Sequence, residues 1–114
     1  MSNPNKAKGT RWEVAVAAFL RASGFPECFR MAPGGEFDAG DLAGAHPDFA
    51  YECRDRAKFD LAKNVRDAEL RAVHKGCKWG VAIIKKRGAN VREGYVVMSL
   101  DQFAEIMGQL PHQS

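Results

Sequence analysis

The spacing of apolar residues predicts a helix near the start of the chain. Thr10 followed by Glu13 fits the capping box that begins many helices, and Gly24 is a typical end signal. Residues 1–9 lack an apolar period, so we expect a flexible basic N-terminal arm. The apolar residues at helical spacing are Trp12, Val16, Phe19 and Leu20.

The period shortens between Phe29 and Arg54, which predicts a β-hairpin or β-meander of three short strands. Gly34-Gly35 predicts a turn, and residues 44–47 form a second break. Residues 49–54 alternate as in a strand. Phe49, Tyr51 and Cys53 are expected on one face, and Ala50, Glu52 and Arg54 on the other.

A second helix is predicted between Asp60, a good N-cap residue, and Gly76. Its buried stripe is predicted at Leu61, Val65, Ala68 and Ala72, and its outward face at Lys63, Arg66, Asp67 and Arg71. Asp67 and Glu69 could contribute an acidic metal ligand from this helix, but Lys63 and Arg71 can pair with them at helical spacing, and we expect that pairing.

The apolar run Trp79–Ile84 predicts a central strand that is covered on both faces. A basic loop follows it, and residues 95–98 predict another strand. Ser99 and Gln102 fit a capping box for a last helix. Its apolar residues are Leu100, Phe103, Ile106 and Met107.

The resulting order is α-β-β-β-α-β-β-α, which predicts an α/β (α+β) fold with a central mixed sheet flanked by helices. The chain has 114 residues, enough for one hydrophobic core. We expect a single domain over residues 10–110 and a tail over residues 111–114.

Composition excludes several classes of protein. No apolar run approaches the ~20 residues of a membrane span, and no signal peptide is recognised. Cys28, Cys53 and Cys77 are odd in number and widely spaced, which favours reduced core thiols over disulfides or a zinc site. We therefore expect a cytoplasmic protein without a membrane partner.

Charge is distributed unevenly along the chain. Residues 31–60 hold three basic and seven acidic side chains, whereas residues 61–98 hold nine basic and three acidic ones. An acidic block inside a basic protein suits one surface for phosphates and another for a divalent cation. Chance clustering of solvated charges is the alternative.

The acidic block contains a candidate metal site. Two carboxylates that share one Mg²⁺ must lie within roughly 3–4 Å of each other. Asp41 can lie beside Glu52 on an adjacent strand, and the backbone carbonyl of Cys53 adds a third oxygen. Asp48, four residues before Glu52, is about 13 Å away along a strand and is too far. Asp38 is the reserve partner if the register differs.

Four short segments in this order resemble the PD-(D/E)XK nuclease superfamily. They are Lys8-Gly9-Thr10, Glu13, Gly40-Asp41 and Glu52-Cys53-Arg54. Within the superfamily, the order is similar to archaeal-type Holliday-junction resolvases and to small phage-encoded resolvase-like endonucleases. The resemblance spans residues 8–98 and implies a restriction-endonuclease-like core. It also implies DNA recombination or repair, or phage DNA processing, in a bacterial cytoplasm or in that of a phage's host.

The resemblance implies that Asp41, Glu52 and the Cys53 carbonyl bind Mg²⁺, for which Mn²⁺ can substitute. Glu13 would contact a metal-bound water or a second ion. Arg54 would orient the attacking water or stabilise charge on the phosphate. Arg54 departs from the usual lysine, and an arginine cannot serve as a general base. Either the metal alone activates water, or the protein is slow or inactive.

The expected partner is branched or duplex DNA, and no nucleotide cofactor is expected. A junction has two-fold symmetry, which favours a homodimer that uses the last helix or the strand at residues 95–98. Candidate phosphate contacts are Lys6, Lys8, Arg11, Lys63, Arg66, Arg71, Lys85, Lys86 and Arg87. Two further functions stay open. One is a nuclease of the same fold that acts on nicks, flaps or mismatches, and the other is a non-catalytic DNA-binding module disabled by Arg54.

Structural roles for the same residues also stay open. Glu13 has a capping role in the predicted box, and Asp41 after Gly40 fits a simple turn. Glu52 and Arg54 could form only an ion pair within one strand. The basic residues could form only a solvated surface.

Overall fold

The computed structural model describes residues 4–32 and 38–113, and its helices and strands follow the predicted order. The elements are α1 (Pro4–Ala22), β1 (Phe29–Arg30), β2 (Leu42–Ala43), β3 (Phe49–Arg54), α2 (Leu61–Lys75), β4 (Trp79–Ile84), the 3₁₀ helix η2 (Val91–Glu93), β5 (Tyr95–Val97) and α3 (Leu100–Gln109). The chain is thus an α+β domain.

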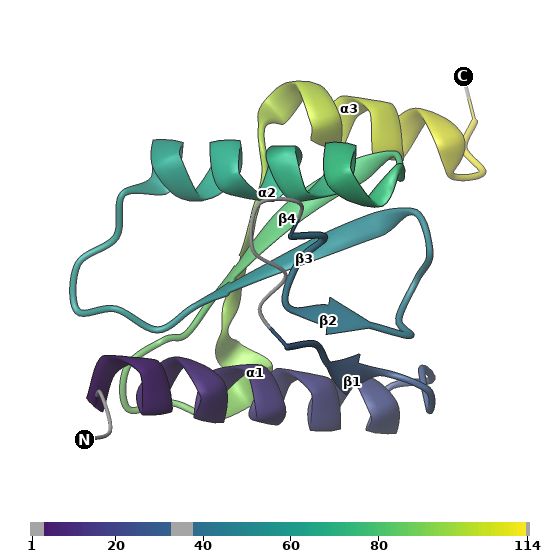
Figure 1. Cartoon of the computed structure of the whole chain (residues 1–114). Helices are drawn as coiled ribbons and strands as arrows, with labels where there is room; N and C mark the ends of the chain where they lie inside the picture. Colours follow the sequence, from purple (N-terminus) through teal and green to yellow (C-terminus); the bar gives the residue numbers. More distant parts are fainter. Residues whose placement is uncertain (1–3, 33–37, 114) are drawn as a thin grey trace.

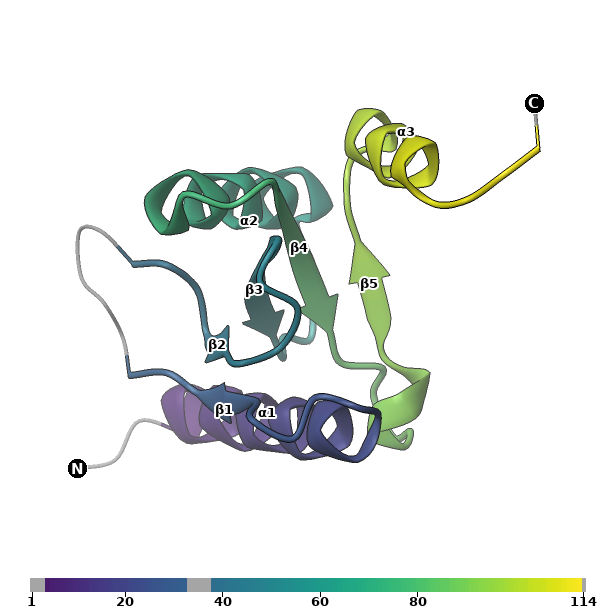
Figure 2. The same cartoon turned by 90° about the vertical axis from the view of Figure 1, so that its right-hand side faces the viewer.

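A three-stranded mixed sheet lies at the centre of the fold, in the order β3-β4-β5. β4 runs parallel to β3, in register from Phe49↔Trp79 to Arg54↔Ile84, and antiparallel to β5. α2 covers one face and α1 lies across the other, with α3 beside β5 (Figures 1 and 2). The buried central strand predicted at Trp79–Ile84 is confirmed.

The predicted meander takes a different form. β1 and β2 make a separate antiparallel pair beside α1. Asp41 connects this pair to β3, because its N–H donates to the Tyr51 carbonyl (2.7 Å) and its carbonyl accepts from the Met31 N–H (2.8 Å). The turn predicted at Gly34-Gly35 lies outside the described residues.

The predicted beginning of the first helix is wrong. α1 starts at Pro4, so residues 4–9, expected to be an arm, are helical, and residues 1–3 lie outside the described part of the chain. Thr10 is inside the helix rather than at its N-cap. A proline fits a first helical turn, where its missing N–H has no partner to lose.

The ends of α2 are as predicted, but its buried face is rotated. Asp60 accepts from the Lys63 N–H (3.1 Å), and Gly76 closes the helix in the left-handed region (φ 73°). The buried residues are Asn64, Ala68 and Ala72, whereas Leu61 is exposed.

α2 approaches β4 closely because small residues meet at the crossing. A Cβ at Gly80 would lie 2.0 Å from the Ala68 carbonyl oxygen. This close packing brings one flank of α2 over Glu52 and Arg54 of β3, which lie beside β4.

The last helix has half of its predicted capping box. Ser99 accepts from the Gln102 N–H (3.1 Å), but the Gln102 side chain is buried and bonds both the N–H and the carbonyl of Gly80 (3.0 and 2.8 Å). Gln102 therefore attaches α3 to β4. None of the helices described here has the length and apolar character to cross a bilayer.

The alternation predicted for β3 places its two faces in different layers. Tyr51 and Cys53 pack in the apolar core with Trp12 and Val16 of α1. Trp12 also donates from Nε1 to the Ile83 carbonyl (3.0 Å). Cys28 and Cys53 are buried as expected, while Cys77 is partly exposed. The other face of β3, which carries Glu52 and Arg54, therefore lies against α2.

Candidate functional site

Asp41 is held against β3 by the conformation of the residue before it. Gly40 has φ 112°, and a Cβ there would lie 2.9 Å from the Tyr51 carbonyl oxygen, so only glycine fits without strain. Asp41 Oδ2 accepts a hydrogen bond from the Cys53 N–H (2.7 Å). The turn thus places a carboxylate at the edge of the strand that carries Glu52.

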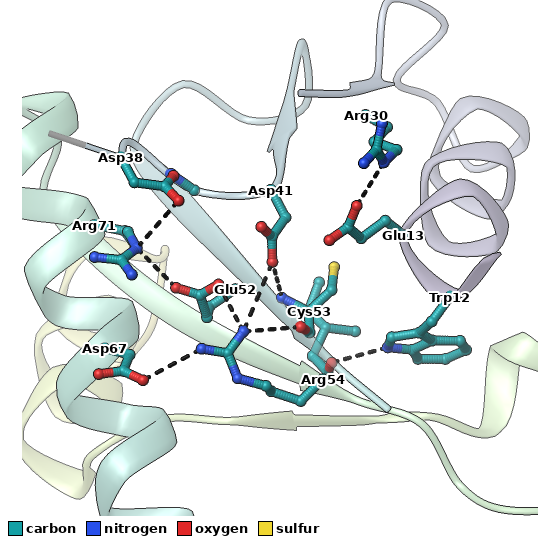
Figure 3. A network of polar contacts seen from close by, with 12 residues as sticks. Trp12, Glu13, Arg30, Asp38, Asp41, Glu52, Cys53, Arg54, Asp67 and Arg71 are labelled. Carbon is teal, nitrogen blue, oxygen red and sulfur yellow. Dashed lines mark hydrogen bonds and ion pairs between the residues drawn. The ribbon is translucent and has the colours of Figure 1, made fainter. Parts of the chain in front are cut away.

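Three oxygen atoms converge on one nitrogen of Arg54 (Figure 3). Arg54 Nη1 lies 2.7 Å from Glu52 Oε1, 3.0 Å from the Cys53 carbonyl oxygen and 3.9 Å from Asp41 Oδ2. These are the three oxygen donors that the sequence proposes for a divalent cation. Glu52 is 3% exposed, so the ion pair within β3 forms on a buried face rather than an exposed one.

Two charged residues of α2 complete this cluster. Arg71 Nε lies 2.9 Å from Glu52 Oε2, although the geometry is that of an ion pair without a hydrogen bond. Asp67 Oδ2 accepts from Arg54 Nη2 (3.2 Å) and from Lys63 Nζ (2.7 Å). The Lys63–Asp67 pairing is as predicted. The Arg71 pairing is not, because Arg71 contacts β3 instead of its own helix.

Glu13 lies on α1 across from Asp41 (Figure 3). Its Oε2 accepts from Arg30 Nε (2.6 Å). Glu13 is therefore paired with Arg30 and not with a backbone N–H at a helix cap. Its negative charge also helps to raise the pKa of Asp41 and the pKa of Cys53.

The electrostatics of the cluster favour a neutral Asp41. Burial raises the pKa of Asp41 to about 8, aided by the charge and hydrogen bond of Glu52, while the Cys53 N–H opposes the shift. Burial would lower the pKa of Arg54, but Glu52 and Asp41 outweigh it and raise that pKa. Asp41 and Glu52 share Arg54, and Arg71 also contacts Glu52, so Asp41 is the carboxyl of this pair with the weaker cationic contact.

The predicted metal ligands are only partly assembled. Asp41, Glu52 and the Cys53 carbonyl come together, whereas Glu13 turns one oxygen to Arg30. Within residues 4–32 and 38–113, no group of three or more His, Cys, Asp and Glu side chains is placed to hold a metal ion. Asp38, the reserve partner, instead accepts from the Gly40 N–H (2.8 Å). Asp41 Oδ2, Glu52 Oε1 and the Cys53 carbonyl oxygen nevertheless surround one position, which a nitrogen of Arg54 occupies.

A pocket of about 190 Å³ opens beside these residues. Its wall includes the first turns of α1 and the end of β3. The cationic side chains in the wall are Lys6, Arg30, Arg54 and Arg56, and the acidic ones are Glu13 and Asp55.

Among the predicted phosphate contacts, Lys6 lines this pocket, and Lys8 and Lys85 contact Asp55 in its wall. β3 and β4 are parallel and in register, so their carboxyl ends lie side by side. The chain leaves the sheet there at Arg54–Arg56 and at Lys85–Arg87. Lys8 and Lys85 both pair with Asp55 (3.6 and 3.7 Å), and Lys86 pairs with Glu93 (4.0 Å). The exposed candidates are Lys6, Arg11, Lys63, Arg66, Lys86 and Arg87. Arg71 is not among them, because it points into the carboxylate cluster.

Sequence reasoning missed three charged residues of the site, which are Arg30, Asp55 and Arg56. Arg30 ends the short strand β1 and neutralises Glu13. Asp55 follows the Glu52-Cys53-Arg54 segment directly, and its side chain is only 6% exposed between two lysines. The position of Asp55 next to that segment was the one available signal, whereas nothing local links Arg30 to α1.

Comparisons with family models, with curated proteins and with solved structures found no match to this chain.

Proposed function

We propose that the chain is a metal-dependent endonuclease that hydrolyses phosphodiester bonds in DNA, with a four-way junction as its substrate. The observation that carries this proposal is the convergence of Asp41 Oδ2, Glu52 Oε1 and the Cys53 carbonyl on a single cation position. The junction specificity rests on the resemblance to Holliday-junction resolvases alone.

Asp41, Glu52 and the Cys53 carbonyl would hold the divalent cation. When bound there, Mg²⁺ supplies a Lewis acid for the phosphate and lowers the pKa of bound water. Arg54 remains protonated at any working pH, so its part is to bind the phosphate and stabilise its developing charge. Glu13, on α1, would accept a hydrogen bond from a water bound to this ion.

The pocket beside the carboxylates supports the proposal because of its charge. Four cationic and two acidic side chains line its wall, and a phosphate is the anion that a DNA partner would place there. The lysines and arginines at the ends of β3 and β4 extend the same positive surface outward, where flanking phosphates would lie.

A second copy of the chain is the proposed protein partner. β5 is an edge strand of the sheet, and apolar side chains are exposed on it, on α3 and directly after α3. They are Tyr95, Val96, Leu100, Phe103, Met107 and Leu110. Paired cuts in a symmetric junction need two such sites.

The test is cleavage of a labelled four-way junction and of a matched duplex by the full chain, with Mg²⁺, Mn²⁺ or a chelator. The proposal expects paired, symmetric nicks in the junction that need metal. Cutting of both substrates would keep the nuclease and remove the junction specificity. Tight binding without cutting in either metal would favour the non-catalytic module.

A further inference from the structure

Arg54 occupies the position that the proposed metal would need. Its Nη1 contacts Glu52 Oε1 and the Cys53 carbonyl at 2.7 and 3.0 Å, with Asp41 Oδ2 at 3.9 Å. Mg²⁺ takes oxygen ligands at about 2.1 Å, so an ion among these atoms and the guanidinium nitrogen exclude each other. The two cations also repel each other at such short range.

The guanidinium has a second partner outside the carboxylate pair. Its Nη2 lies 3.2 Å from Asp67 Oδ2, on α2. Asp67 contributes none of the three oxygens that surround Nη1. A planar group with several donors can therefore leave those oxygens and keep an ion pair with Asp67.

Glu52 would not be left without a partner if Arg54 moved. Arg71 Nε stays 2.9 Å from the other carboxylate oxygen, Oε2. Glu52 is thus bracketed by two arginines, of which only Arg54 also contacts the other proposed metal-binding oxygens. Arg71 would therefore still balance the charge of Glu52 after Arg54 Nη1 had left its position.

We propose that Arg54 is a built-in competitor of the metal, which fills the cation position in the metal-free protein and moves toward Asp67 when a divalent cation binds. The inference rests on the proposed function, since it concerns the same three oxygens. It gives Arg54 a role in setting metal affinity, in addition to its proposed contact with the phosphate.

The experiment measures Mn²⁺ binding by the full chain without DNA, from the electron paramagnetic resonance signal of free Mn²⁺. Arg54→Gln keeps an N–H donor for Glu52 and removes the competing charge. We expect it to bind Mn²⁺ at least roughly tenfold more tightly than wild type, the change that one charge-assisted hydrogen bond gives. Arg56→Gln is the matched control, because it removes the same charge from an exposed position in the same pocket wall. Its Kd is expected to stay within about threefold of wild type.

A second variant, Arg54→Lys, tests the same proposal if Arg54→Gln does not fold. In Arg54→Lys, a single ammonium can pair with Glu52 or with Asp67 but lacks the fork that contacts both, so Mn²⁺ affinity should rise severalfold. If wild type binds Mn²⁺ as tightly as both variants, the competition is refuted and the metal site stands. If no variant binds Mn²⁺, the proposed function fails together with the inference.

Discussion

At the scale of single residues, each carboxylate of the cluster is distinguished by the cation that lies nearest to it. Glu52 is buried between Arg54 and Arg71, and Glu13 is paired with Arg30. Asp41 has the weakest cationic contact, at 3.9 Å from Arg54, and it is the carboxyl whose pKa is raised to about 8. Its position follows from Gly40, which allows the backbone to pass close to Tyr51.

Asp41 should make the metal-free protein less stable as pH rises. Its folded pKa, about 8, lies above the unfolded value of 3.8, so the folded state binds the proton more tightly. The stability from this group is complete below pH 4 and is lost as pH rises toward 8. Asp41→Asn should reduce that fall by on the order of a few kcal/mol. Urea unfolding of both proteins between pH 4 and 8 in chelator checks this, and parallel curves would contradict it.

The residues of the cluster differ in how far the sequence could identify them. Asp41, Glu52 and the Cys53 carbonyl follow from strand alternation and from the short turn that brings one strand beside the next. Arg71 could not be predicted, because helical periodicity alone places it on the outward face of α2. Its contact with Glu52 depends on how closely α2 packs on the sheet, which is a tertiary property.

At the scale of elements, the crossing of α2 over β4 positions half of the site. The helix can bring Asp67 and Arg71 to β3 only because Gly80 and Ala68 allow the two backbones to approach. Periodicity predicted both elements and the ends of α2. It placed Leu61 on the buried face and did not include Asn64 there, because the face that a helix buries is set by its crossing angle and not by its apolar residues alone.

Gly80→Ala should destabilise the fold, since its Cβ would lie 2.0 Å from the Ala68 carbonyl oxygen. Relief requires a shift of α2, and we expect a loss of about 1–3 kcal/mol in the free energy of unfolding. Gly108→Ala is the control, because a Cβ there meets nothing within 4 Å in α3. It should be neutral or stabilising by up to ~1 kcal/mol. Equal stability of the two variants in urea would refute the close-packing account.

At the scale of the whole molecule, basic residues gather where β3 and β4 leave the sheet, near the start of α1. Apolar side chains are exposed on β5 and α3, and others are exposed on α1 and α2. The sequence predicted the element order and the charged blocks. It could not predict that α1 begins at Pro4, because residues 4–9 carry no apolar period to mark a helix.

The basic residues that follow β3 and β4 should govern the salt dependence of DNA binding. Replacing both Lys86 and Arg87 with alanine should weaken binding and reduce the slope of log K against log salt by about two, nearly one for each lost phosphate contact. Lys78→Ala, which removes a charge just before β4, at the other end of that strand, should leave the slope unchanged. Fluorescence anisotropy with a labelled duplex at several salt concentrations gives the slopes. Equal slopes in all three proteins would place the DNA elsewhere.

The exposed apolar side chains of β5 and α3 should govern the oligomeric state of the protein. Leu100 is 79% exposed at the start of α3, and Leu100→Lys should convert a dimer into a monomer. Val73→Lys is the matched control, since Val73 is 73% exposed on α2. Sedimentation velocity measures all three masses. A wild-type monomer, or dissociation by the control alone, would exclude this face.

The most direct test of the proposed metal site is the rate of DNA cleavage in Mg²⁺ by wild type, Asp41→Asn and Asp48→Asn. An asparagine at 41 can still accept from the Cys53 N–H, so the fold should survive while a proposed metal ligand loses its charge. Asp48 is the control, because it is an acidic residue just before β3, at the opposite end of that strand from Glu52. The account predicts that Asp41→Asn slows cleavage by roughly 10²-fold or more and that Asp48→Asn matches wild type. Full activity in Asp41→Asn, or loss in Asp48→Asn alone, would contradict it.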